Sequence, residues 1–374
     1  MVYADGNTGI AEVIWNLEGL AFNSPGTVQV SGKLKGLAIN TTAAVEVVSG
    51  WDLDEIVNEI RSRTVNLSIP LGEGLGNYSQ SAYNALLAAL DHADELSTGG
   101  NMTEEQFNLA RNSLAEAEAA LSASLNLTQD GVTYNVYRDF ENDTTGKQPF
   151  GIEATRIQSG GAAQIVEESE NTFLRLSTGP TKGYVNMFLP YIGQVFATGD
   201  QRVVVEYSAR FQKGLQYANA FQPKNQTGAY AMTVAFENAG NDPWIRVAES
   251  SVWKNVKPFS YDTWYHFKII ADMDAQTYSV YMGDEVIAEN FAFRTEGSTV
   301  LTGHVFGIDG FPNGQVDFDN IQVKIASVAE KAEQNAPLGL GHQKVSFITG
   351  TVNGTIGIIN QRESWRDGYV ESDI

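Results

Sequence analysis

The hydrophobic period of this chain changes along its length, and that change limits the possible folds more than any other feature. Apolar and polar residues alternate through residues 1–50, apolar residues recur with a helical period through 51–128, and alternation returns through 129–327. Alternation indicates strands with one buried face, and a period near 3.6 residues indicates amphipathic helices. Long blocks of each kind rarely share one core, so the sequence predicts separate modules, and 374 residues leave room for two or three.

The charge balance narrows the classes of partner. Asp and Glu number 45 against 24 Lys and Arg, which gives a formal net charge of −21. Such a surface repels phosphate backbones and anionic lipids, so nucleic acid and membrane surfaces are poor candidates, while cations, neutral sugars and basic surfaces remain. The sequence contains no cysteine, which excludes disulfides and thiolate metal sites, and no apolar run long enough to span a membrane.

The first module, residues 1–50, has the pattern of a small β-sandwich. Its strand-like runs are AEVIWNL, GTVQVSGKL and AAVEVVSG, with a turn signal at NSPG. In the YADG turn, Trp15 and the PGTVQVSG strand it resembles a bacterial Ig-like domain of the kind repeated along surface proteins and secreted polysaccharide-degrading enzymes. That family begins one strand earlier, so the resemblance implies a partial domain.

Residues 51–128 are predicted to form a three-helix bundle. WDLDEIVNEIRSR and SAYNALLAALDHADEL each place their apolar residues on one stripe. A third helix begins at Thr103, where Gln106 three residues later completes a capping-box pattern. Three helices that each bury one stripe make a small bundle. The helices resemble short helical modules of Gram-positive exported proteins, which implies a spacer.

Residues 129–327 are predicted to form a two-sheet sandwich or jelly roll, because about a dozen short strands alternate with polar turns. The strand-like runs are GVTYNVYRDF, TFLRLST, YVNMFLP, RVVVEYSARF, AYAMTVAFE, WIRVAES, WYHFKIIADM, TYSVYMG, VIAENFAF and VDFDNIQVKI. From DFENDTTGKQPFGI through DTWYHFKIIADMDAQTYSVYMGDEVI to VDFDNIQV, the region resembles concanavalin-like and carbohydrate-binding jelly-roll families. The remaining residues, 328–374, are expected to be a linker that starts as a helix and leads into a further β-module.

Four acidic residues at the two ends of the sandwich are candidate calcium ligands. If VDFDNIQVKI is one strand, Asp317 and Asp319 lie on the same face as Ile321, and Asp139 and Glu141 share a face of the first strand in the same way. In the families that the region resembles, the first and last strands lie close together and a structural Ca²⁺ often joins them. Carboxylate oxygens are the ligands that Ca²⁺ prefers. The resemblance matches Glu141 and Asp319 best; pairing with arginine or capping of turns is the alternative.

Aromatic residues near polar loop sequence are candidate sugar contacts. Trp244 lies in NDPW and Trp253 in SSVWKN, and Tyr217 and Tyr230 lie in the preceding segment. Arg246 can add polar contacts, because a sugar presents C–H faces to aromatic rings and hydroxyls to polar groups. Core packing is the alternative for each ring, and Trp264, inside a strand, is expected in the core.

The sequence offers little sign of a catalytic site. The four histidines fall in separate modules or strands, and neither an H-E-x-x-H pair, a G-x-S-x-G elbow nor a phosphate-binding loop occurs. The closely spaced carboxylates of retaining glycosidases are missing too. Tyr261, Tyr265 and His266 form the one neighbourhood that could serve a lyase. The sequence does not decide whether the chain is an enzyme, and most of these observations favour a non-catalytic protein.

Together these patterns predict a multi-domain, mainly β protein: a partial Ig-like β-sandwich, a helical spacer, a concanavalin-like jelly roll and the start of another module. The expected function is non-catalytic binding of polysaccharide or cell-wall glycan in a secreted or cell-surface bacterial protein, beside further modules of the same polypeptide. A structural stalk- or layer-forming protein is the first alternative. A polysaccharide lyase or glycoside hydrolase fragment is the second.

Overall fold

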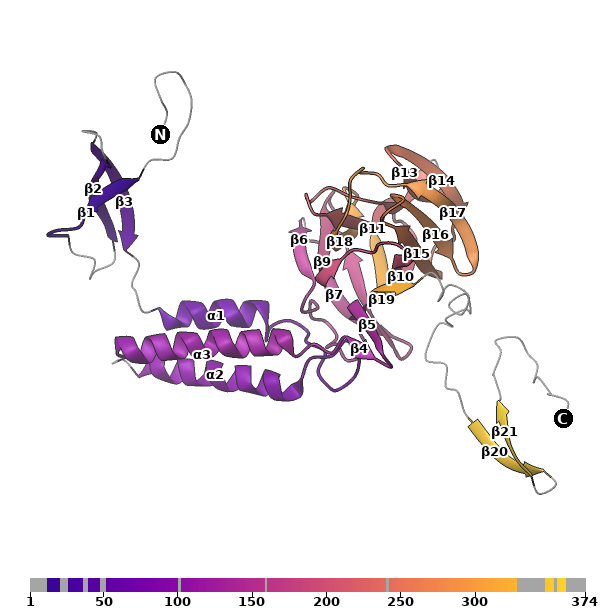
Figure 1. The fold of residues 1–374 in the computed structure, drawn as a ribbon, viewed down its shortest axis with the longest axis horizontal. Coiled ribbons are helices and arrows are strands. Elements are labelled where there is room, and N and C mark those ends of the chain that lie inside the picture. Colours follow the sequence, from indigo (N-terminus) through magenta and orange to yellow (C-terminus); the bar gives the residue numbers. More distant parts are fainter. Residues whose placement is uncertain are drawn as a thin grey trace, which may run out of the picture. The chain divides into compact units, whose positions relative to one another are not determined.

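A computed structural model describes residues 12–20, 26–35, 40–47, 52–99, 102–158, 160–239, 242–327, 347–352 and 355–360 (Figure 1). These residues divide into two compact units. The first lies within Met1–Val132, Asp139–Gly151 and Ala163–Leu174, and the second within Thr133–Arg138, Ile152–Ala162 and Arg175–Ile374. Across the described ranges, no helix has the length and apolarity needed to cross a membrane.

Three strands near the N-terminus form an antiparallel sheet in the order β1 (Val13–Asn16), β2 (Gly26–Leu34) and β3 (Asn40–Val47). Gly32 on β2 faces Trp15 on β1, and a Cβ at this glycine would lie 2.7 Å from the indole ring. Only glycine therefore lets Trp15 lie against β2 at this distance. The strands occur where alternation predicts them, and the Ig-like assignment stays a prediction.

The three predicted helices are present as α1 (Leu53–Arg63), α2 (Gln80–Thr98) and α3 (Glu104–Ala123). Thr103 and Gln106 form the predicted capping box at the start of α3, where each side chain accepts a hydrogen bond from the other residue's backbone N–H. The apolar stripes meet in one core that includes Leu53, Val57, Ile60, Leu86, Leu90, Phe107, Leu114 and Leu121.

The helical unit extends beyond the predicted boundary at residue 128. Phe150, from the segment Asp139–Gly151, packs on the helical core with its ring 5.2 Å from that of Tyr78. Ser68, after α1, donates from Oγ to Asp143 Oδ1 (2.6 Å) and from its backbone N–H to the Gln148 carbonyl. These contacts belong to the same unit, so part of the predicted sandwich segment folds with the helices.

The β-rich region contains two large sheets, which confirms the mainly β prediction. One sheet follows the order β17-β16-β15-β10-β19-β5-β4, with β8 pairing with β19 and β7 with β8. Its strands are β4 (Thr128–Gln129), β5 (Val132–Arg138), β7 (Ala162–Glu168), β8 (Asn171–Ser177), β10 (Gln201–Phe211), β15 (Trp264–Asp272), β16 (Thr277–Met282), β17 (Glu285–Ala292) and β19 (Gln315–Ser327). The predicted β15–β16 hairpin and the pairing of β5 with the closing strand β19 are both present.

The second sheet is antiparallel throughout, in the order β14-β13-β12-β11-β18-β9-β6. Its strands are β6 (Glu153–Ile157), β9 (Tyr184–Val195), β11 (Tyr217–Asn225), β12 (Val234–Ala239), β13 (Asp242–Glu249), β14 (Val252–Pro258) and β18 (Leu301–Asp309). The core lies between the two sheets, because Tyr207 on β10 stacks on Phe221 of β11 and Phe318 on β19 packs against Phe306 of β18. The region is a two-sheet β-sandwich.

The prediction that Asp317 and Asp319 share a face with Ile321 is wrong, because β19 contains a bulge. Gln322 pairs with Glu206 of β10, but Asp319 pairs with Ser208, so β19 holds one extra residue between them. Asn320, inside this interval, has a φ of 52°. The bulge reverses the alternation of faces.

Beyond the bulge Phe318 points into the core, and Asp317 pairs with Arg210 on the outer face of the sheet. Both aspartates are buried all the same, with Asp317 0% and Asp319 3% exposed.

In the C-terminal segment β20 (Phe347–Val352) and β21 (Thr355–Asn360) form an antiparallel hairpin, in the stretch where strands are predicted. The helix expected after residue 327 lies outside the described residues.

Candidate functional site

The outer face of the seven-stranded sheet carries a row of aromatic and acidic side chains. Tyr217 on β11 pairs with Glu237 on β12, Glu237 with Trp244 on β13, and Trp244 with Pro258 on β14. Paired residues in antiparallel strands project from the same face. Their chain neighbour Phe236 is buried between the sheets, so this row projects outward.

A second row lies beside the first and is polar, with small residues between the polar ones. Across β9, β18, β11, β12, β13 and β14 the paired residues are Asn186, Gly307, Asn219, Ala235, Arg246 and Asn255. A Cβ at Gly307 would lie 2.2 Å from the Val185 carbonyl and 2.4 Å from Asn186 Oδ1, so this position requires glycine.

Asp309, the last residue of β18, orders the amides of this face. Asn219 donates from Nδ2 to Asp309 Oδ2 (2.6 Å), and Asn186 donates from Nδ2 to Oδ1 (2.9 Å). Tyr217 in turn donates from its hydroxyl to Asn219 Oδ1 (2.9 Å). Bonds from amide N–H groups to a carboxylate are charge-assisted, so the network fixes the orientation of both amides.

Burial, together with the nearby charge of Asp309, raises the pKa of Tyr217 to about 12, although Arg246 and Arg294 act in the opposite direction. Burial also raises the pKa of Tyr230, again with Asp309 adding to the shift. Both hydroxyls therefore stay protonated and able to donate hydrogen bonds at neutral pH.

Trp253, on the edge strand β14 of the sheet, lies close to two arginines. The Arg246 guanidinium carbon is 5.2 Å from the centre of its ring, and that of Arg294 is 5.8 Å away. Arg246 forms an ion pair with Glu237, and Arg294 also lies 5.8 Å from the ring of Tyr230. Cations this close to an aromatic face are attracted to it, which orients both the ring and the guanidinium groups.

The structure thus brings together the five residues proposed as sugar contacts from sequence: Trp244, Trp253, Arg246, Tyr217 and Tyr230. The sequence pattern missed five further polar residues of the same face: Asn186, Asn219, Glu237, Asp309 and Arg294. They come from separate strands and loops, and only the cross-strand register reveals that they are neighbours. No local motif in the sequence marks them.

Two other polar neighbourhoods do not form an equivalent site. Tyr261 donates to the Leu215 carbonyl and the Tyr265 hydroxyl accepts from the Ser260 N–H, so both phenols serve the local fold. Tyr265 and His266 are consecutive strand residues and therefore point to opposite faces of their sheet. They cannot act on one substrate as a lyase pair.

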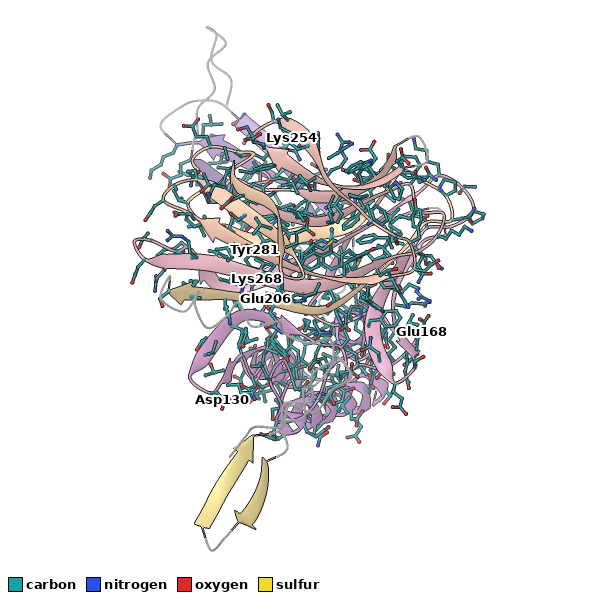
Figure 2. The ribbon with its side chains drawn as sticks, turned by 90° about the vertical axis from the view of Figure 1, so that its right-hand side faces the viewer. Asp130, Glu168, Glu206, Lys254, Lys268 and Tyr281 are labelled. Atoms are coloured by element: carbon teal, nitrogen blue, oxygen red, sulfur yellow. The ribbon has the colours of Figure 1, made fainter. Side chains whose placement is uncertain are left out.

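His266 instead faces Glu206, with Nε2 3.7 Å from Oε2, and Lys268 Nζ lies 3.9 Å from Oε1. Figure 2 shows Glu206, Lys268 and Tyr281, which follow one another across β10, β15 and β16. Burial raises the pKa of Glu206, but His266, Lys268 and Lys324 lower it by more, so this carboxylate stays charged as a structural anion.

Asp317 has arginine partners where the sequence suggested calcium. Arg175 donates to Oδ1 from Nε (2.7 Å), and Arg210 and Gln212 donate to Oδ2 (each 2.8 Å). Two guanidinium groups neutralise this buried carboxylate and fill its lone-pair positions, so Asp317 does not fit a metal site. Trp264, expected in the core, is partly exposed and lies 4.9 Å from the Arg210 guanidinium.

Two of the other proposed calcium ligands, Asp139 and Glu141, do not share a face of the first strand as the sequence predicts. β5 ends at Arg138, and Phe140 has a φ of 61°, so Asp139 and Glu141 follow the strand instead of sharing its face. They belong to the first unit and Asp319 to the second. In the described part of the chain, no group of three or more His, Cys, Asp or Glu side chains is arranged to hold a metal. Calcium binding by Asp139, Glu141 and Asp319 stays a prediction.

No family model and no curated protein matches the sequence. Among solved structures, the chain is similar to a sialidase at 14% identity and a TM-score of 0.41, over 54% of this chain and only 19% of the sialidase. It is also similar to the globular domain of T. cruzi calreticulin (10%, TM-score 0.38, 55% of this chain and 93% of that one). A third is domain 4 of AbnA, a GH43 extracellular arabinanase from Geobacillus stearothermophilus in complex with arabinotriose (15%, TM-score 0.34, 52% and 94%). At these values the similarities carry no argument about function.

Proposed function

We propose that the outer face of the seven-stranded sheet binds a glycan, and that the chain is a non-catalytic glycan-binding region of a secreted or cell-surface protein. The observation that carries the proposal is that aromatic rings and polar side chains share this face. Trp244, Trp253 and Tyr217 are partly exposed and offer ring surfaces, and the partly exposed Asn186, ordered by Asp309, offers a fixed polar group on the same face.

This combination fits the chemistry of a sugar. The C–H face of a pyranose packs on an aromatic ring, while its hydroxyls need donors and acceptors at fixed positions. An amide held by a carboxylate has lost its rotational freedom before the ligand arrives, so binding costs less entropy.

The test is retention on polysaccharide gels, using a panel of neutral and acidic plant and bacterial glycans. We expect Trp253→Ala and Trp244→Ala to weaken binding about tenfold each, because an aromatic contact is worth about 1.5 kcal/mol. Trp15→Ala is the matched control, since Trp15 is 41% exposed and lies in the N-terminal sheet. Equal loss in the control, or no retention of the wild type on any glycan, would remove the proposal. Release of sugar products on prolonged incubation would contradict a non-catalytic role.

Calcium binding is a separate proposal for Asp139, Glu141 and Asp319, and it rests on the resemblance of the first and last strands to calcium-binding jelly rolls. Carboxylates that share a Ca²⁺ repel one another once it is removed. We therefore expect a chelator to lower the melting temperature and added Ca²⁺ to restore it. An unchanged melting curve would remove this proposal and leave the glycan proposal intact.

A further inference from the structure

Contacts of both its backbone and its guanidinium group hold Arg294 beside the proposed binding face. Its backbone N–H donates to the Ala231 carbonyl (2.7 Å), and Nη1 donates to Thr233 Oγ1 (3.1 Å). Thr233 is fully buried, so it is a rigid anchor. The guanidinium lies 5.8 Å from the ring centres of both Tyr230 and Trp253. The side chain is therefore held in place, although it is exposed to solvent.

The three cations of the neighbouring strands β13 and β14 are each paired with a carboxylate. Arg246 pairs with Glu237, Lys257 Nζ lies 2.6 Å from Glu285 Oε2, and Lys254 Nζ lies 3.4 Å from Glu249 Oε2. Both oxygens of Asp309 accept from asparagine amides.

Within the described ranges, Arg294 has no carboxylate partner, and its side chain makes no hydrogen bond besides that from Nη1 to Thr233. This is notable in a chain with 45 acidic and 24 basic residues, where acidic partners are abundant. An arginine that is held in place beside aromatic rings and forms no ion pair can bind an anionic ligand without first breaking an ion pair.

We propose that Arg294 binds the charged group of an anionic sugar, so that the glycan taken by this face is acidic. The inference rests on the proposed function and names the class of its ligand. A guanidinium fork matches the paired oxygens of a carboxylate or a sulfate ester and can form two parallel hydrogen bonds to it. The rings of Tyr230 and Trp253, each with its centre 5.8 Å from the guanidinium carbon, attract the cation and help to hold it in place.

The position of Arg294 also suits a sugar substituent. Trp253, the ring proposed to pack against a sugar, contacts this guanidinium directly. A pyranose placed on that ring would have a carboxylate or sulfate on its edge within reach of Arg294. A neutral sugar would leave the guanidinium in contact with water, as in the free protein. The guanidinium would then add nothing to the affinity for that sugar.

The experiment compares polymers that share a backbone and differ in charge: polygalacturonate against fully methyl-esterified pectin, and dextran sulfate against dextran. We expect the wild type to bind one of the charged polymers at least about tenfold more tightly than its neutral partner, because a hydrogen-bonded charge pair is worth about 1.5 kcal/mol or more. The first pair reports a carboxylate and the second a sulfate ester.

Variants assign the preference to the side chain. Arg294→Gln should abolish the preference for the charged polymer, and Arg294→Lys should retain only part of it, because an ammonium lacks the planar fork. Lys213→Gln, an exposed lysine in the turn after β10, changes the net charge equally and should leave the preference intact. Equal binding of charged and neutral polymers, or an equal loss of both in Arg294→Gln, would overturn this inference and leave glycan binding standing. Failure to bind any polymer would overturn both.

Discussion

Asp317 shows at the scale of one residue how a buried charge is accommodated in this fold. Its carboxylate is 0% exposed and is bound by Arg175 and Arg210, whose exposed fractions are 16% and 15%. Burying a lone carboxylate costs many kcal/mol, but two guanidinium groups supply both the opposite charge and the hydrogen bonds. The pattern of acids in VDFDN indicates that a cation is needed and does not distinguish arginine from calcium.

We expect Asp317→Ala to destabilise the sandwich by about 3–5 kcal/mol, because it leaves two partly buried guanidinium groups without a counter-charge. Urea unfolding followed by tryptophan fluorescence measures the change. Asp284→Ala, in the exposed β16–β17 turn, is the control and should change the stability by less than about 0.5 kcal/mol. A loss at Asp317 no larger than that of the control would contradict the arrangement described here.

Elements with strong periodicity are predictable from this sequence, and elements whose residues are closely packed or belong to the candidate site are not. The three helices and the β15–β16 hairpin lie where their patterns predict them. The alternation of apolar residues does not predict the central strands β11 and β18, which hold Asn219 and Asp309 of the candidate site.

The reason lies in their residues. β18 contains Gly303 and Gly307, which are poor strand formers on their own, and the close approach of β9 leaves no room for a Cβ at either position. β11 contains Asn219, which binds Asp309, and Pro223, and both residue types are depleted in strands. Likewise, the bulge at Asn320 depends on how β19 meets β10, which no pattern within β19 specifies. Aromatic candidates could be found from sequence, whereas the amides and acids beside them require the register of the sheet.

At the scale of the whole molecule, acid should act on the stability in two opposite directions. The net charge of −21 destabilises a compact state through self-repulsion, and this repulsion falls as the pH approaches the pI of about 4.5. His304 acts in the other direction. It is 2% exposed, packs against Phe221 and Phe306, and Nδ1 has no hydrogen-bond partner among the described residues. Burial lowers the pKa of His304 to about 3 from 6.5.

Because the folded protein holds His304 neutral while the unfolded chain takes up a proton below pH 6.5, the stabilising contribution of this residue is complete above that pH and is lost as the pH falls toward 3. Between pH 7 and pH 5 the wild type should therefore lose about 2 kcal/mol of unfolding free energy relative to His304→Leu. The comparison cancels the surface repulsion, which both proteins share, and any pH-independent packing change in the variant. Urea unfolding at the two pH values measures the difference, and parallel pH dependence of the two proteins would show that His304 is not held neutral in the core.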